Sequence, residues 1–264
     1  MRTRTVFSDP ELGDLTLDRL TRDVSIFQRA KGHRFSSDDV VTAYVAARVA
    51  PGATRVLDLG CGIGSVLLHL AWTLPRASLV GIEAQEVSYR LLTRNIAQND
   101  LSTRVHAHHG DLREATVAKY GGGFDLVTGT PPYFPPSSAL DAEDEQRAYA
   151  RIEYRGGIDD YVRAAARFVS EDGVVVLCGD SRTDGRVAEA AHETGLFLFE
   201  RCDVISKAGQ APLFSVWCLS RHARPLSHPT MTLRTEHGET TDDAKRLRRF
   251  SGLESGPSSS PPVD

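Results

Sequence analysis

Three closely spaced glycines follow a carboxylate at the end of an apolar run in the stretch Val56–Gly64. Gly60, Gly62 and Gly64 permit a sharp turn and the close approach of a ligand, because they lack Cβ atoms. The apolar-periodic segment Ser65–Leu74 comes next. The pattern therefore predicts a strand, a tight turn and a helix whose first amides point at a bound ligand, as in sites for nucleotide-like cofactors.

Acidic side chains stand at or beside the ends of three predicted strands. Asp58 directly precedes the glycine turn, Glu83 ends a second apolar run, and Asp111 follows a third. Glu83 lies where an acidic residue reaches ribose hydroxyls, and Asp111 where a side chain reaches a base edge. A carboxylate beside the turn would repel a pyrophosphate and attract a cation. We therefore expect S-adenosylmethionine, which carries an ammonium and a sulfonium but no phosphate, rather than a nicotinamide dinucleotide.

A proline cluster follows a fourth apolar run. The run is Phe124–Thr128, and the cluster occupies Gly129–Pro136. Prolines lack the N–H groups of a strand ladder, so the cluster cannot continue a central strand. It must form a loop at the carboxyl end of that strand, where ligands of open α/β sheets bind.

Predicted strands and helices alternate along most of the chain. This order implies an α/β fold with a mostly parallel sheet, right-handed crossovers and helices on both faces, while a final strand pair without a helix between implies an antiparallel edge. The predicted strands are Val24–Gln28, Arg55–Leu59, Ser78–Glu83, Arg104–His109, Phe124–Thr128, Gly173–Cys178, Leu196–Ile205 and Leu213–Leu219, and the predicted helices are Val40–Val49, Ser65–Leu74, Glu86–Asn99, Ile158–Val169 and Arg186–Thr194.

Three regions divide the chain. Residues 1–33 are expected to form an N-terminal arm, residues 34–221 the main domain, and residues 222–264 a C-terminal tail. Order is expected to decline after Arg221, and Ser255–Asp264 is predicted to be disordered because it is rich in Ser, Pro and Gly. Ser137–Gly157 is charged and poor in aliphatic residues, which predicts a surface excursion or lid.

Composition excludes several classes of protein. A chain of 264 residues with 41% hydrophobic content suits one sizeable domain with additions or two small ones. No apolar run is long enough to cross a bilayer and no secretory pattern follows Met1, so we expect no membrane association and a cytoplasmic protein. The four cysteines form no C-x-x-C pair, so no metal site is expected. The net charge of −4 weakens a nucleic-acid hypothesis without removing it, because a local basic patch is enough.

The glycine turn with its flanking motifs resembles the Rossmann-like S-adenosylmethionine-dependent methyltransferases. The resemblance rests on Asp58–Gly64, Gly81–Glu83, Gly110-Asp111 and the Pro-Pro-Tyr loop, and it covers roughly Arg34 to Leu219. It implies a mostly parallel sheet of seven strands with an antiparallel edge. It also implies that Gly60, Gly62 and Gly64 hold the methionine part of the cofactor, that Glu83 binds the ribose, and that Asp111 and Leu112 bind the adenine.

The loop Gly129–Phe134 resembles the Asn-Pro-Pro-Tyr motif of methyltransferases that act on planar amino or amide nitrogens. The lone pair of such an amine is delocalised, so two acceptors must hold its hydrogens while an aromatic ring stacks on the base. By this resemblance Thr130, Pro131, Pro132 and Tyr133 are catalytic, and Thr130 also faces the cofactor. Thr130 stands where the motif has Asn, and its hydroxyl accepts a hydrogen bond but is shorter than a carboxamide.

Within that group the chain resembles the tRNA adenine N6-methyltransferases that modify the base beside the anticodon of a valine tRNA. Gln28, the segment Arg34–Asp38, Phe134 and the segment Arg147–Arg151 carry this resemblance. It implies a tRNA substrate and places Arg34 and Asp38 near the methionine end of the cofactor. Basic groups that RNA would need occur in two segments, Arg147, Arg151 and Arg155 after the loop and Lys245, Arg246, Arg248 and Arg249 near the C-terminus.

Two alternatives stay open beside transfer to N6 of adenine in tRNA. Thr130 and the acidic balance fit a protein-glutamine or small-molecule N-methyltransferase. Thr130 also fits a cofactor-binding scaffold that has lost activity and supports a partner subunit. The sequence leaves the oligomeric state open.

Overall fold

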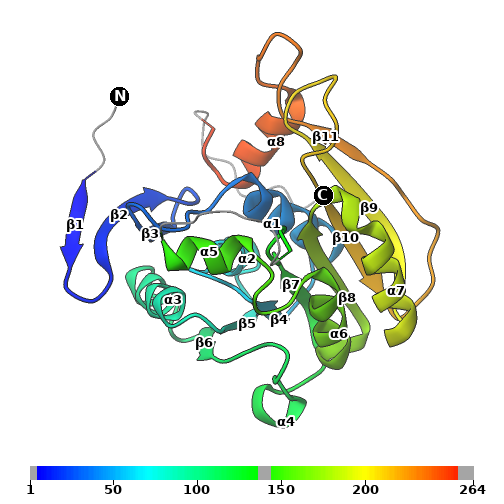
Figure 1. Ribbon diagram of the computed structural model, residues 1–264, viewed down its shortest axis with the longest axis horizontal. Coiled ribbons are helices and arrows are strands. Elements are labelled where there is room, and N and C mark those ends of the chain that lie inside the picture. Colours follow the sequence, from blue (N-terminus) through cyan, green and yellow to red (C-terminus); the bar gives the residue numbers. More distant parts are fainter. Residues whose placement is uncertain (1–4, 136–143, 255–264) are drawn as a thin grey trace.

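The computed structural model describes residues 5–135 and 144–254, which build one large mixed sheet and one small antiparallel sheet (Figure 1). The large sheet has eight strands in the order β11-β9-β10-β8-β7-β4-β5-β6. Strands β4 to β8 pair in parallel, whereas β10 runs antiparallel to both β8 and β9. The chain order reverses direction on either side of β4, so the topological switch point lies between β4 and β7.

The strands of the large sheet alternate with helices along most of the chain. The strand bounds are β4 Arg55–Leu59, β5 Ser78–Glu83, β6 Val105–His109, β7 Phe124–Gly129, β8 Val169–Gly179, β9 Phe197–Ile205, β10 Phe214–Ser220 and β11 Thr230–Thr232. The helix bounds are α1 Ser37–Val49, α2 Ser65–Thr73, α3 Glu86–Gln98, α4 Val117–Tyr120, α5 Glu145–Arg151, α6 Ile158–Phe168, α7 Asp184–Thr194 and α8 Asp242–Phe250, with a 3-10 turn η1 at Ser181–Thr183.

Helices cover both faces of the large sheet, and alternate residues of each strand pack into the hydrophobic cores on its two sides. On β4, Val56 packs with the helices α1, α2 and α3, whereas Leu57 and Leu59 pack with α6 and α7. This alternation puts Asp58 on the same face as Val56, beneath α1 and α2. The pattern explains why a carboxylate inside an apolar strand is buried, with only 2% of its surface exposed.

The N-terminal arm is a three-stranded antiparallel sheet of β1 (Val6–Asp9), β2 (Gly13–Arg19) and β3 (Ser25–Arg29). It lies beside α3 at the left of Figure 1. Asn95 on α3 joins this sheet to the glycine turn, because its Oδ1 accepts from the backbone of Phe27 at 2.7 Å while its Nδ2 donates to the carbonyls of Phe27 at 3.1 Å and Ile63 at 3.0 Å. The side chain is fully buried, and this one residue provides hydrogen-bond partners for backbone groups of both segments.

The segment expected to be a tail contributes β11 and α8 to the fold. β11 pairs in parallel with β9 at the edge of the large sheet. The ring of Phe250 on α8 stacks on that of His69 on α2, with the ring centres 5.8 Å apart. It also packs edge-on against the ring of Tyr44 on α1, with the ring centres 5.4 Å apart. Order therefore continues past Arg221, as far as residue 254, and the part predicted to be disordered, 255–264, lies outside the described residues.

The observed fold confirms the predicted α/β class with a mostly parallel sheet and an antiparallel edge. The sheet has eight strands instead of the seven implied by the resemblance, because β11 adds to its edge. β8 begins already at Val169, directly after α6, whereas the prediction began at Gly173. Across the two described stretches, none of the helices combines the length and apolar character needed to span a bilayer.

Candidate active site

A cavity opens at the carboxyl ends of β4, β5, β6 and β7, beside the switch point. It encloses about 810 Å³ of space free of atoms, including its open mouth. Its walls come from the glycine turn, from Glu83–Gln85, from Gly110–Leu112 and from the loop after β7. Ligands of open α/β sheets bind at this position, outside the carboxyl ends of the strands and beside the switch point.

The glycine turn forms the floor of the cavity. Gly60 and Gly62 adopt positive φ angles of 57° and 55°. A Cβ at Gly60 would collide with the hydroxyl of Tyr161, whereas a Cβ at Gly62 would meet no atom within 4 Å and would project into open space. Gly60 is thus required by packing, and Gly62 leaves room for a ligand to approach the backbone.

Glu83 holds the glycine turn from the end of β5. Its Oε2 accepts from the backbone amide of Gly62 at 2.8 Å, and its Oε1 accepts from that of Gln85 at 2.6 Å. Burial raises the pKa of Glu83, and these two amide donors oppose the rise. The carboxylate lines the cavity and retains lone pairs that a ligand hydroxyl can use.

Buried carboxylates give the cavity and its floor a negative character. Asp39 on α1 lines the cavity, where burial raises its pKa and the nearby charge of Asp38 adds to the rise. Asp58 lies behind the turn, and burial raises its pKa to about 7. Its Oδ1 accepts from the hydroxyl of Thr128 at 2.7 Å, but its buried Oδ2 accepts no hydrogen bond from the described residues. This environment fits a cationic ligand, which would stabilise the ionised carboxylates.

The far end of the cavity combines an acidic strand end with an arginine. Asp111 is held by Arg113 through a guanidinium contact at 2.6 Å, and this partner lowers the pKa of the carboxyl. Arg155 also lines the cavity, with its guanidinium 4.5 Å from the ring of Tyr149 on α5. Its Nη1 is buried and donates to none of the residues that the structure describes. A polar ligand here would find one donor ready for it.

The loop after β7 closes the other end of the cavity. Thr130 and Pro132 line it, while the hydroxyl of Tyr133 donates to Asp38 Oδ2 at 3.0 Å and lies 2.9 Å from Cys178 Sγ. Burial raises the pKa of Tyr133 well above its usual value, so the phenol stays protonated. The loop therefore sits against α1 and β8 with its aromatic ring anchored at the hydroxyl.

The structure brings together most of the residues that the sequence singled out. Among the predicted site residues, those that line the cavity are Gly60, Gly62, Glu83, Asp111, Leu112, Thr130 and Pro132. Those outside its lining are Arg34, Asp38, Asp58, Gly64, Pro131 and Tyr133. Arg34 instead contacts β2, where it donates to Thr16 Oγ1 at 2.9 Å and pairs with Asp18.

Several lining residues carried no site prediction. They are His33, Asp39, Ser65, Ser88, Tyr149 and Tyr161. Asp39 lies in the first turn of α1, and Tyr161 lies among the buried residues of α6. Only the tertiary fold turns these groups inward, although the acidic pair Asp38-Asp39 after a capping serine was a usable signal. The described ranges 5–135 and 144–254 hold no cluster of three or more His, Cys, Asp or Glu residues suited to a metal ion.

Sequence comparison points to methyl transfer. A family model described as a methyltransferase domain matches residues 56–152. The chain is 29% identical over 204 residues to a tRNA1(Val) (adenine(37)-N6)-methyltransferase of Yersinia pseudotuberculosis serotype O:3 (strain YPIII), which covers 76% of this chain and 73% of the relative. A relative of the same name from Yersinia pestis (strain Pestoides F) is also 29% identical, over 76% of this chain and 75% of its own length.

Solved structures share the fold at low sequence identity. A predicted O-methyltransferase from Agrobacterium tumefaciens superposes with a TM-score of 0.62 at 16% identity, over 84% of this chain and 100% of its own. M. jannaschii TYW2, solved in complex with AdoMet, superposes with a TM-score of 0.55 at 17% identity, over 79% and 87%. By its domain model and its curated relatives the chain is thus similar to S-adenosylmethionine-dependent methyltransferases, and it shares the Rossmann-like fold of the solved structures.

Proposed function

We propose that the protein transfers a methyl group to the exocyclic N6 of an adenine in tRNA. The observation that carries this proposal is that Thr130 and Pro132 of the Pro-Pro-Tyr loop line the same cavity as the glycine turn and Glu83. A planar amine held by the loop would thus meet the cofactor in one enclosed space. The curated relatives, named for adenine 37 of a valine tRNA, support adenine in tRNA as the target. A tRNA substrate makes the cytoplasm the expected place of action.

The cavity residues divide between the parts of the cofactor. Asp39 and, from behind the turn, Asp58 would stabilise its ammonium and sulfonium charges. Gly60 and Gly62 would let its methionine part lie close to the backbone of the turn. Glu83 would accept from the ribose hydroxyls. The remaining end has Asp111, Leu112 and the free donor of Arg155 for the adenine.

The loop residues would orient the target base. When bound, S-adenosylmethionine supplies a methyl group activated by its sulfonium. Thr130 Oγ1 and a proline carbonyl are the acceptors available to hold the amine hydrogens. The ring of Tyr133, anchored through its hydroxyl to Asp38 Oδ2 at 3.0 Å, provides a fixed surface for the base.

Methyl transfer to nucleosides tests the proposal directly. Native total tRNA is incubated with the protein and radiolabelled cofactor, digested to nucleosides and separated. We expect label in N6-methyladenosine. Label in protein or in a metabolite instead would identify the glutamine or small-molecule methyltransferase favoured by Thr130. Cofactor binding without any transfer, with activity gained in Thr130→Asn, would identify a scaffold that has lost catalysis at this position.

Cofactor affinity should depend on pH through the buried carboxylates. The pKa of Asp58 is raised to about 7 and that of Asp39 is raised as well, so both hold protons at mildly acid pH in the folded protein. A cation binds the ionised forms better, so affinity for S-adenosylmethionine should rise about tenfold between roughly pH 5.5 and 7.5. Calorimetry measures this rise. Asp58→Asn should flatten it, and S-adenosylhomocysteine, which lacks the sulfonium charge, should show a smaller rise; an equal rise for both ligands would contradict the assignment.

The two basic segments should contribute differently to tRNA binding. Arg147 and Arg151 are exposed beside the cavity, close enough for their charges to act on His33. On α8, by contrast, Lys245 pairs with Asp242 at 2.8 Å and Arg246 with Asp243 at 2.9 Å.

We expect Arg147→Gln combined with Arg151→Gln to weaken tRNA binding about tenfold and to lower the slope of log Kd against log salt by about 2. Filter binding at several salt concentrations measures both quantities. The control, Lys245→Gln combined with Arg246→Gln, should change them little, because both cations are already paired. Equal losses in the two double variants would show that the rim of the cavity is not the preferred RNA surface.

A further inference from the structure

The end of the Pro-Pro-Tyr loop is held by the chain that follows α5. The backbone amide of Phe134 donates to the carbonyl of Arg151 at 3.0 Å, and the amide of Glu153 donates to the carbonyl of Phe134 at 2.9 Å. These two hydrogen bonds form a short parallel bridge between Phe134 and Ile152. The position of the loop therefore depends on the position of residues 151–153.

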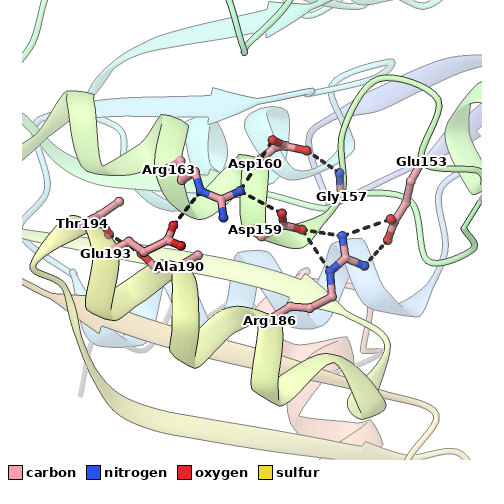
Figure 2. A network of polar contacts seen from close by, with 9 residues as sticks. All are labelled: Glu153, Gly157, Asp159, Asp160, Arg163, Arg186, Ala190, Glu193 and Thr194. Carbon is pink, nitrogen blue, oxygen red and sulfur yellow. Dashed lines mark hydrogen bonds and ion pairs between the residues drawn. The ribbon is translucent and has the colours of Figure 1, made fainter.

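Arg186 of α7 holds that segment through Glu153. Its Nη1 and Nη2 contact the two carboxylate oxygens of Glu153 at 2.8 and 3.1 Å, and its Nε donates to Asp159 of α6 at 3.0 Å (Figure 2). The side chain of Glu153 is only 10% exposed, so water competes little for this two-point contact. One guanidinium thus ties the segment after α5 to both α6 and α7.

The same guanidinium supports the wall of the cavity. A Cβ at Gly157 would collide with Nη2 of Arg186, which shows how closely the guanidinium packs on the turn 153–157. Arg155 and Gly156 of that turn line the cavity, whereas Arg186 does not. Displacing Arg186 would therefore move both the loop and the wall without touching a ligand.

We propose that Arg186 is a positioning residue that fixes the Pro-Pro-Tyr loop through Glu153. This inference rests on the proposed function only for its activity readout. Methyl transfer requires the amine and the methyl group to be aligned within a fraction of an ångström, so a small shift of the loop lowers the rate of transfer with little effect on cofactor binding.

Arg163 provides a matched control within the same network. It lies on α6 and contacts Asp159 at 2.8 Å and Glu193 at 2.9 Å, without a contact to Glu153 or the loop (Figure 2). The side chains of Arg163 and Arg186 are 39% and 40% exposed. The two arginines thus differ chiefly in whether they reach the segment after α5.

The first measurement is amide hydrogen exchange in the full chain. We expect Arg186→Gln to lower the protection of the Phe134 and Glu153 amides about 10- to 100-fold, the range for losing a charge-assisted pair, while Arg163→Gln leaves them unchanged. Arg186→Lys, which keeps the charge but loses the two-point contact, should fall between. Unchanged protection in Arg186→Gln, or equal losses in the two glutamine variants, overturns the inference whatever the substrate proves to be.

The second measurement is steady-state methyl transfer. We expect Arg186→Gln to lower kcat about 10- to 100-fold while KM for the cofactor stays within about twofold, and Arg163→Gln to retain kcat within about twofold. Equal losses of kcat in both variants would overturn a positioning role. Wild-type protein that transfers no methyl group to tRNA would instead refute the proposed function, and the exchange experiment would then decide the inference alone.

Discussion

Glu83→Gln should weaken cofactor binding about 100-fold. Two backbone amides, those of Gly62 and Gln85, converge on this buried carboxylate at 2.8 and 2.6 Å. A carboxamide has the same shape but turns one of its two acceptors into a donor, so an amide N–H would face an NH₂ group and lose its partner. The expected loss combines that unsatisfied donor with weaker contact to the ribose. Isothermal titration with S-adenosylhomocysteine gives the affinity.

Glu86→Gln is the control for this substitution. Glu86 also carries a carboxylate close to the end of β5, but it is exposed and pairs with Arg90 at 2.6 Å on the surface of α3. Its replacement should change affinity less than twofold, because exposed ion pairs contribute little. Affinity of Glu83→Gln within threefold of the wild type would mean that neither the ribose nor the glycine turn depends on this carboxylate.

Tyr133→Ala should lower kcat/KM for tRNA about 100-fold and leave cofactor affinity almost unchanged. Stacking of a base on an aromatic ring contributes about 1–3 kcal/mol, and loss of the ring also frees the loop from α1 and β8. Tyr133→Phe keeps the ring and loses only the hydroxyl contacts to Asp38 and Cys178, so a loss of about tenfold or less is expected. Initial rates at varied tRNA concentration separate the two variants.

Tyr89→Ala provides an aromatic control outside the cavity. Tyr89 lies on α3 and stacks on His109 at 5.1 Å, on the far side of β5 from the loop. Its replacement should leave kcat/KM within about threefold. If Tyr133→Phe lost as much activity as Tyr133→Ala, the hydroxyl and its contact to Asp38 would matter more than the ring, and the stacking role would be wrong.

Local patterns were sufficient for the elements that carry the cofactor turn. The bounds of β4 and β5 agree with the predicted Arg55–Leu59 and Ser78–Glu83, because apolar runs ending in a carboxylate or glycines are short-range signals. The edge strand β11 was missed. It spans only Thr230–Thr232, and its pairing partner β9 lies well before it in the chain, so no local pattern marks it. α8 coincides with the basic run near the C-terminus, and its apolar contacts come from Leu247 and Phe250, which are too few to form a helical pattern.

The site residues at strand ends were predictable from the sequence, whereas those that helix packing brings to the site were not. Glu83 and Asp111 stand at strand ends, so their shared cavity follows from a parallel sheet. Asp39 reaches the cavity because the first turn of α1 lies beside it, and Arg186 reaches Glu153 because α7 packs on α6. Neither contact leaves a periodic trace in the sequence. The likeness to methyltransferases pointed to the loop Thr130–Tyr133 but not to the side chains that hold it.

The buried carboxamide of Asn95 has a consequence for how the molecule comes apart. It joins the backbone of Phe27 in the small sheet to the carbonyl of Ile63 inside the glycine turn. Detaching the first three strands would therefore remove the hydrogen-bond partners that Phe27 provides to the buried Asn95 carboxamide, next to the glycine turn. We therefore expect proteolysis within the arm to loosen the glycine turn and to lower the affinity for the methyl donor.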